Sequence, residues 1–161
     1  MIIKELVRTI PQVGTVDFIS IRPVARGPVE KKDSVEVSIE EGLIGDHYGR
    51  ASGKRQVTLI QSEHLEAVAK LLGKENVDPA LTRRNIVVSG VNLLAFKDLH
   101  FQIGDVVLEF TGLCYPCSRM EQNLGHGGYN AMRGHGGITT RVIKGGTIKL
   151  GDEVKLIDLE E

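Results

Sequence analysis

The chain has 161 residues, 41% of them hydrophobic and 25% charged, and these shares are typical of a folded domain and not of a disordered segment. Its 20 basic and 21 acidic side chains leave a net charge of −1, so we expect no nucleic acid and no membrane surface as a partner. The first residues carry charge too early for a secretory signal, and no stretch has the roughly 18 apolar residues of a membrane span. We therefore expect a single domain over residues 1–161, located in the cytoplasm with both cysteines reduced.

Short apolar stretches that favour strands occur along the whole chain. The clearest is 34–39, where polar residues alternate with β-branched ones, as in a half-buried strand. Residues 16–21 show a similar pattern. Apolar runs bounded by Gly, Pro, Asn or Asp predict further strands at 57–60, 86–91, 106–110 and 154–157.

One segment has the spacing of a helix. Its apolar residues recur on one helical face: Leu65, Val68, Ala69 and Leu72. Ser62 is the expected N-cap and Gly73 the expected stop. A second, shorter helix is expected to begin at Asp78-Pro79, because Asp caps helices and Pro fits the first helical position.

One pattern, apolar-x-apolar-Gly-Asp-x-Val, occurs within 101–108 and again within 148–156. Each copy predicts a strand, a Gly-Asp turn and a second strand, and Lys144-Gly145-Gly146 predicts another hairpin turn. Hairpins at this spacing suit a closed or nearly closed antiparallel barrel. The expected fold class is therefore mainly β, a β-barrel with one or two peripheral helices.

Two thiols, Cys114 and Cys117, follow a predicted strand and enclose a Tyr-Pro pair, which places them at the rim of the sheet. A free thiol is mostly protonated at neutral pH unless a cation, a metal or a helix N-terminus stabilises its anion, and Arg119 is the nearest candidate cation. Four interpretations are open here: incidental structural thiols, a redox dithiol, a zinc site completed by His126 and His135, or one thiolate presented to a metal carried by a cofactor. The redox type normally opens a helix in a βαβ unit, and the zinc pattern lacks the usual histidine spacing.

In order and spacing, several short motifs between about residue 42 and residue 154 resemble the MOSC (molybdenum cofactor sulfurase C-terminal) domain family. The motifs are Gly42-Leu43-Ile44-Gly45-Asp46, Arg55-Gln56-Val57-Thr58-Leu59-Ile60, Arg83-Arg84-Asn85-Ile86-Val87-Val88-Ser89-Gly90, Ile103-Gly104-Asp105, Cys114-x-x-Cys117-x-Arg119, Gly136-Gly137-Ile138, Gly145-Gly146 and Gly151-Asp152. The resemblance implies a barrel of the MOSC type, similar to the pyruvate kinase barrel, whose rim binds molybdopterin. It also implies a cysteine that ligates molybdenum or carries activated sulfur, and by its place in the motif that cysteine is Cys117.

The resemblance further implies contacts to the molybdenum cofactor. The family's Arg-x-Asn segment falls on Arg83 and Asn85, and this transfer makes physical sense. A guanidinium fork matches a phosphate, and an amide matches the edge of a pterin. Arg84, Arg119 and Arg55 stand in the matching motifs and are further expected cofactor contacts.

Two other segments have local interpretations. Asp46 is expected to cap a turn beside an exposed His47. The Gly- and His-rich stretch 122–135 is expected to be a mobile loop that closes over a bound cofactor. His126 and His135 are then exposed loop residues.

Similar stand-alone members of the family imply a molybdenum-dependent reductase of N-hydroxylated small molecules, with Cys117 as catalytic residue and metal ligand. A separate electron-donor protein is expected, because the chain has no further cysteines and no G-x-G-x-x-G after a strand that would indicate an iron–sulfur or flavin site. Two alternatives stay open: a carrier that takes a persulfide on Cys117 from a sulfur donor, and a non-catalytic zinc- or ligand-binding module. The oligomeric state has no signature in the sequence.

Overall fold

The computed structural model describes residues 1–48 and 53–159. The strands are β1 (Gly14–Ile21), β2 (Glu30–Lys32), β3 (Ser34–Ser38), β4 (Gly42–Leu43), β5 (Val57–Gln61), β6 (Ile86–Ser89), β7 (His100–Ile103), β8 (Val106–Leu113), β9 (Ile138–Lys144), β10 (Gly146–Lys149) and β11 (Glu153–Ile157). The α-helices are α1 (Ile3–Leu6), α2 (Ser62–Leu71), α3 (Ser118–Leu124) and α4 (Gly128–Met132), and the 3-10 helices are η1 (Pro79–Thr82) and η2 (Leu93–Phe96). None of these described helices is long and apolar enough to cross a membrane.

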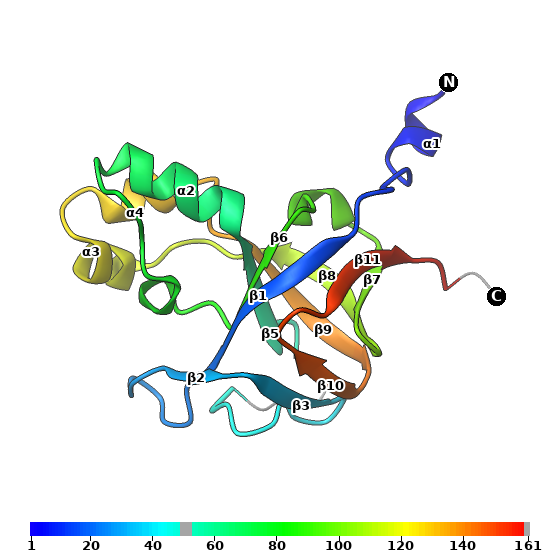
Figure 1. Cartoon of the computed structure of the whole chain (residues 1–161), viewed down its shortest axis with the longest axis horizontal. Coiled ribbons are helices and arrows are strands. Elements are labelled where there is room, and N and C mark those ends of the chain that lie inside the picture. The colour runs from blue at the N-terminus through cyan, green and yellow to red at the C-terminus, as the bar shows by residue number, and fades with distance from the viewer. Residues whose placement is uncertain (49–52, 160–161) are drawn as a thin grey trace.

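Seven of the described strands close into a barrel, seen in Figure 1. Their order around the ring is β11-β7-β8-β9-β5-β6-β1, and pairing of β1 with β11 closes it. β2 extends the sheet beyond β1, while β10, β3 and β4 form a separate three-stranded sheet. The prediction of a mainly β fold built on a barrel is confirmed.

The barrel is mixed, whereas the turn signals predicted an antiparallel one. β5 and β6 pair in parallel, with Leu59 opposite Ile86. α2 connects these two strands, and a helical crossover returns the chain in the same direction. All five residues of β5 are buried, as expected for a strand that is covered on both faces.

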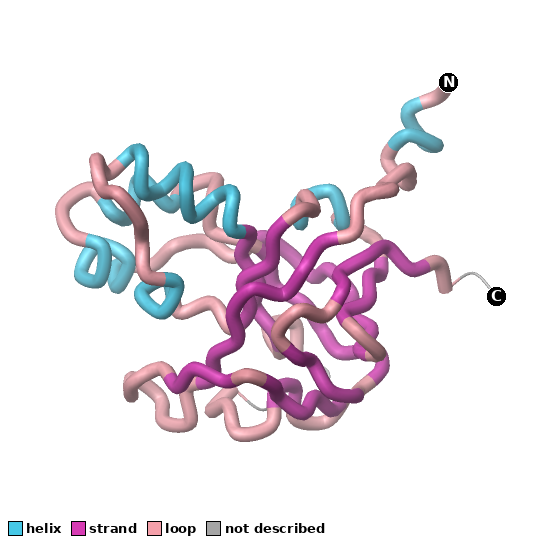
Figure 2. The backbone as a smooth tube through the Cα atoms, in the orientation of Figure 1, coloured by secondary structure: helices cyan, strands magenta, loops and turns pink. Residues whose placement is uncertain are grey.

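Apolar side chains fill both sides of the barrel wall. Ile19, Leu59 and Phe101 belong to the cluster inside the barrel, and each has no exposed surface. Val68 and Met120 belong to a second cluster, which packs the helices against the outer face. Figure 2 shows α2, α3 and α4 gathered on one side of the strands. On that side the barrel wall is covered on its inner face by the first cluster and on its outer face by the helices.

The predicted long helix is present as α2, with Leu65, Val68 and Ala69 buried. Its N-cap is Gln61 and not the expected Ser62, which is the first helical residue. Gly73 follows the helix at a φ of +67°, a backbone conformation that favours glycine. The second predicted helix is the short η1, and Asp78 caps it by accepting the N–H of Ala80 at 3.0 Å.

Two predicted hairpins are wrong. Strands flank Gly145 and the Gly151-Asp152 turn as expected, but β10 pairs with β3, not with β9 or β11. At Gly145 the chain passes between the two sheets, and an added Cβ would lie 2.5 Å from the carbonyl oxygen of Val37. Pairing of β10 with a strand over a hundred residues earlier is a long-range choice that turn residues do not encode.

The stretch 122–135 is not the predicted loop, because it contains the end of α3 and all of α4. The carboxylate of Glu121 joins the two helices by accepting the N–H groups of Gly127 at 2.8 Å and Tyr129 at 3.0 Å. Leu124 and Met132 are buried against the barrel. A short, Gly-rich segment hides the helical period from sequence patterns, which is why these helices were not predicted.

Candidate functional site

The two cysteines lie between the end of β8 and the start of α3. Cys114 is buried, and its N–H donates to the carbonyl oxygen of Gly137 at 2.8 Å. Cys117 is exposed and occupies the position directly before α3. Of the two cysteines, Cys117 is therefore the one that a ligand can reach, and its role as a metal ligand stays a prediction.

Arg84 holds the cysteine loop in place. The guanidinium is buried and donates to the carbonyl oxygens of Gly136 at 2.7 Å and Cys114 at 3.2 Å, and also to Thr82 at 2.9 Å and Tyr115 at 3.5 Å. Burial lowers the pKa of Arg84, and the nearby thiol of Cys114 opposes this shift. These contacts give Arg84 a positioning role, and direct contact with a cofactor stays a prediction.

The approach of Gly136 to the cysteine loop requires glycine. A Cβ on Gly136 would lie 2.0 Å from the carbonyl oxygen of Cys114, a separation that no side chain tolerates. The carbonyl oxygens of Gly136 and Cys114 both accept hydrogen bonds from Arg84. The close approach of Gly136 and the buried guanidinium therefore both fix the position of the cysteine loop.

Asn85 links three strands at the same end of the barrel. Its Oδ1 accepts the backbone N–H and the hydroxyl of Thr58, both at 3.0 Å, and its Nδ2 donates to the carbonyl oxygen of Ser20 at 3.2 Å. Both ends of the amide are thus engaged within the protein. The predicted contact of Asn85 with a pterin stays a prediction.

A polar cavity of about 90 Å³ lies beside Asn85. Three arginines line it together with the turn that carries Asp46 and His47: Arg22, Arg55 and Arg83. Arg83 ends η1 in the left-handed backbone conformation, with a φ of +62°. The structure thus brings the predicted Arg55 and Arg83 to one cavity.

Arg22 was not predicted as a site residue. It follows β1 directly, and its half-buried guanidinium faces charged groups from several elements. Burial lowers the pKa of Arg22, Asp46 raises it, Arg119 lowers it and Cys117 raises it. Its position in the sequence could have indicated it, because Arg22 directly follows the predicted strand 16–21 and a cation at that place lies at the rim of a sheet.

Some of the described arginines lie near the two cysteines. Arg55 donates from Nη2 toward the sulfur of Cys114 at 3.8 Å. Arg119 is half-buried and interacts electrostatically with Arg22, while Cys117 interacts with both Arg22 and Arg84. Three cations from separate segments of the chain, Arg22, Arg55 and Arg84, therefore interact with this pair of thiols, and sequence spacing alone could not show that they meet.

The predicted capping role of Asp46 is present. Its Oδ1 accepts the N–H of Arg22 at 2.8 Å and its Oδ2 accepts the N–H of Tyr48 at 3.4 Å. His47 is exposed, as expected, but its ring also contacts Arg22. The turn is therefore capped by Asp46, and it also holds Arg22 at the end of β1 through Asp46 and His47.

The zinc interpretation has no support in the part of the chain that the structure describes, which contains no group of three or more His, Cys, Asp or Glu side chains able to hold a metal ion. His126 is exposed, with its Nδ1 at 3.7 Å from the carboxylate of Glu121. His135 is half-buried and packs edge to face on His64, with ring centroids 5.3 Å apart. Burial lowers the pKa of His64, and His135 lowers it further.

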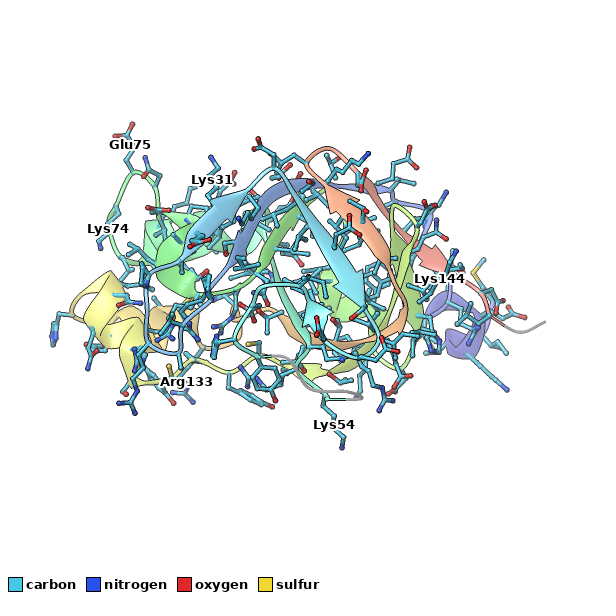
Figure 3. The ribbon with its side chains drawn as sticks, turned by 90° about the horizontal axis from the view of Figure 1, so that it is seen from below. Lys31, Lys54, Lys74, Glu75, Arg133 and Lys144 are labelled. Atoms are coloured by element: carbon cyan, nitrogen blue, oxygen red, sulfur yellow. The ribbon has the colours of Figure 1, made fainter. Side chains whose placement is uncertain are left out.

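A larger cavity, of about 840 Å³, lies between α2, β1 and the segment before η1. Among the described residues that line it there is no cysteine, histidine or arginine. Figure 3 shows two of its lining residues, Lys31 and Glu75, at the edge of the molecule opposite Lys54, the neighbour of Arg55. Size alone would select this cavity, but the three arginines line the smaller one.

Comparison with known proteins gives a family and a fold. The profile of the MOSC domain matches residues 43–155. None of the curated proteins matches the chain. Solved structures of similar fold include the YuaD protein from Bacillus subtilis, with a TM-score of 0.78 and 16% identity over 92% of this chain and 98% of that one.

Two proteins named YiiM are also similar in structure. The one from Escherichia coli has a TM-score of 0.69 and 17% identity, covering 92% of this chain and 71% of its own. The one from Geobacillus stearothermophilus has a TM-score of 0.66 and 15% identity, covering 90% of this chain and 75% of its own. At such identities the likeness shows the fold alone.

Proposed function

The chain belongs to the MOSC domain family, and from this membership we propose that it binds a molybdenum cofactor at the arginine-lined end of its barrel and reduces N-hydroxylated compounds. The observation that carries the proposal is the exposed thiol of Cys117 beside the charges of Arg22 and Arg84. A soft sulfur ligand within a cluster of cations suits a metal carried by an anionic cofactor.

The residues of the cavity fit such a group. Within the described residues, Nε and Nη1 of Arg22 are buried atoms with no hydrogen-bond partner. A buried cationic N–H without an acceptor is costly, so it indicates a water or an anion at that place. A phosphate supplies several acceptor oxygens at once.

Each protein group then has a distinct task. Cys117 would ligate the metal as a thiolate, and Arg83 and Arg55 would bind the phosphate. Arg84 holds the loop of Cys114 and Cys117 in place, because its buried guanidinium donates to the carbonyl oxygen of Cys114 in that loop and to the carbonyl oxygen of Gly136. When bound, the cofactor supplies two-electron oxygen-atom transfer chemistry.

The proposed reaction also defines a partner. Reduction of an N–OH group to N–H consumes two electrons and two protons and releases one water. The chain offers no second pair of exposed thiols, since Cys114 is buried and Cys117 is the metal ligand in this proposal. The electrons therefore come from a separate donor protein.

Metal and pterin analysis of the purified chain tests the proposal. We expect molybdenum and pterin in equal amounts, with reduction of an amidoxime when a chemical electron donor is added. A chain that holds neither, but releases sulfide from Cys117 on treatment with a thiol, is a sulfur carrier instead. Zinc as the sole metal would leave only a binding module.

A further inference from the structure

We infer that Arg22 is a further anion-binding residue of the 90 Å³ cavity, that it takes a phosphate group, and that His47 positions its guanidinium. This inference rests on the proposed function only for the source of the phosphate. The site itself follows from the contacts of Arg22, which neither the family motifs nor the fold comparisons single out.

The backbone of Arg22 is held by the Asp46-His47 turn. The carboxylate of Asp46 accepts the N–H of Arg22 at 2.8 Å. The carbonyl oxygen of Arg22 accepts the backbone N–H of His47 at 2.9 Å and lies 2.9 Å from Nδ1 of the same histidine. Three contacts on one residue at the end of a strand remove most of its backbone freedom.

The side chain of Arg22 is held at one nitrogen. Nη2 lies 3.3 Å from Nε2 of His47. A carbonyl oxygen only accepts and a guanidinium only donates, so these partners assign the proton of His47 to Nδ1 and make Nε2 the acceptor. Neutral His47 thus bridges the carbonyl oxygen and the guanidinium of the same residue, Arg22. The contact at Nη2 fixes the direction in which the other guanidinium nitrogens, Nε and Nη1, point.

The remaining donors of Arg22 point to a missing acceptor. Nε and Nη1 are buried and have no partner in the described part of the chain. The nearby carboxylate of Asp46 already accepts two backbone N–H groups, those of Arg22 and Tyr48. The guanidinium is therefore arranged for an oxygen that the described residues do not provide.

Charge and size define the class of ligand. The described residues that line the cavity include three arginines, Arg22, Arg55 and Arg83, against one carboxylate, Asp46. This excess of two positive charges matches a phosphate dianion. A volume of about 90 Å³ holds a few waters or one such group, and is far below the roughly 300 Å³ or more of sites that enclose a whole organic ligand. The cavity therefore takes the phosphate end of a larger molecule, or phosphate itself.

Titration of inorganic phosphate into the full chain, produced in cells that cannot make the cofactor, tests the role of Arg22. NMR signals of the arginine Nε–H groups and calorimetry both report binding. We expect Arg22→Gln to weaken phosphate binding about ten- to hundredfold, the effect of losing hydrogen bonds to a charged group. Arg26→Gln is the matched control, because it removes the same charge from an exposed position four residues away, and its affinity should equal that of the wild type.

Two substitutions of His47 separate positioning from general stability. Gln offers a carbonyl oxygen near the place of Nε2, whereas Asn reaches only the place of Nδ1. We expect His47→Gln to keep the phosphate affinity and the sharp Nε–H signal of Arg22, and His47→Asn to lose both at an unchanged melting temperature. Equal affinities in these two variants would remove His47 from the inference.

The outcomes for the inference and for the proposed function are distinct. Equal phosphate binding by Arg22→Gln and Arg26→Gln, in a chain that does hold molybdenum, overturns the inference alone. Binding that depends on Arg22, in a chain that holds neither molybdenum nor pterin, supports the inference and overturns the proposed function. Where both hold, loss of pterin in Arg22→Gln identifies the cofactor as the source of the phosphate, and unchanged pterin identifies a free or substrate-borne phosphate.

Discussion

At the scale of single residues, the arginines of the site divide into those that hold the protein together and those that face a cavity. Arg84 donates to carbonyl oxygens of four residues and is buried, whereas Arg55 and Arg83 line the polar cavity. The sequence placed Arg83 and Arg84 in one motif and gave both the same role. Adjacent residues face different surroundings because Arg83 turns the backbone through a left-handed conformation, which residue type alone does not reveal.

Replacing Arg84 tests the structural part of this division. We expect Arg84→Gln to lower the free energy of unfolding by about 2–4 kcal/mol, because several buried carbonyl oxygens lose a charged donor. Urea denaturation measures the change, with the exposed Arg26→Gln as control. If the two variants unfold at the same urea concentration, the contacts of Arg84 contribute nothing measurable to stability.

At the scale of elements, local patterns predicted strands better than they predicted pairing. β1, β3 and β5 were expected because alternation and flanking turn residues are encoded within a few positions. The partners of β10 were not, since its neighbour β3 is distant in sequence. The helices α3 and α4 were missed for another reason: the carboxylate of Glu121, not a helical period, joins them around their glycines.

The link through Glu121 predicts a specific dependence of stability on pH. The N–H groups of Tyr129 and Gly127 lower the pKa of Glu121 below its ordinary value of 4.5. A carboxyl with a lowered pKa in the folded state stabilises the fold above the unfolded pKa, and this contribution is lost as the pH falls through the folded pKa. We therefore expect Glu121→Gln to be less stable than the wild type above about pH 4.5.

Thermal unfolding at a series of pH values measures this difference. The gap between wild type and Glu121→Gln should be constant at neutral pH and should shrink as the pH falls from about 4.5 to the lowered pKa of Glu121. A gap that does not change with pH would mean that the charge of Glu121 has no part in joining α3 to α4.

At the scale of the whole molecule, the barrel is a packed core and not a channel. Phe96 and Phe101 stack with ring centroids 4.4 Å apart, and neither has exposed surface. A ligand therefore has no room inside, and the reactive side chains collect where strands end and loops begin. The mainly β class was predictable from the sequence, but the meeting of Arg22, Arg55 and Cys117 depends on the order β8-β9-β5-β6-β1 in the sheet, which joins segments far apart in the chain.

A core substitution separates the stability of the barrel from the integrity of its site. Phe101→Ala removes a fully buried ring and should lower the free energy of unfolding by about 3–5 kcal/mol through the cavity that it leaves. Phosphate affinity of the folded fraction should stay at the value of the wild type, because Phe101 does not line the polar cavity. A parallel loss of phosphate affinity would show that site and core are coupled.

The most direct test of the central claim is the ratio of molybdenum to pterin in the purified Cys117→Ser and Cys114→Ser variants. We predict that Cys117→Ser retains pterin, held by the arginines, but has lost molybdenum, and that Cys114→Ser retains both, because its sulfur is buried beside Arg55. Loss of molybdenum from Cys114→Ser together with full retention in Cys117→Ser would contradict the account.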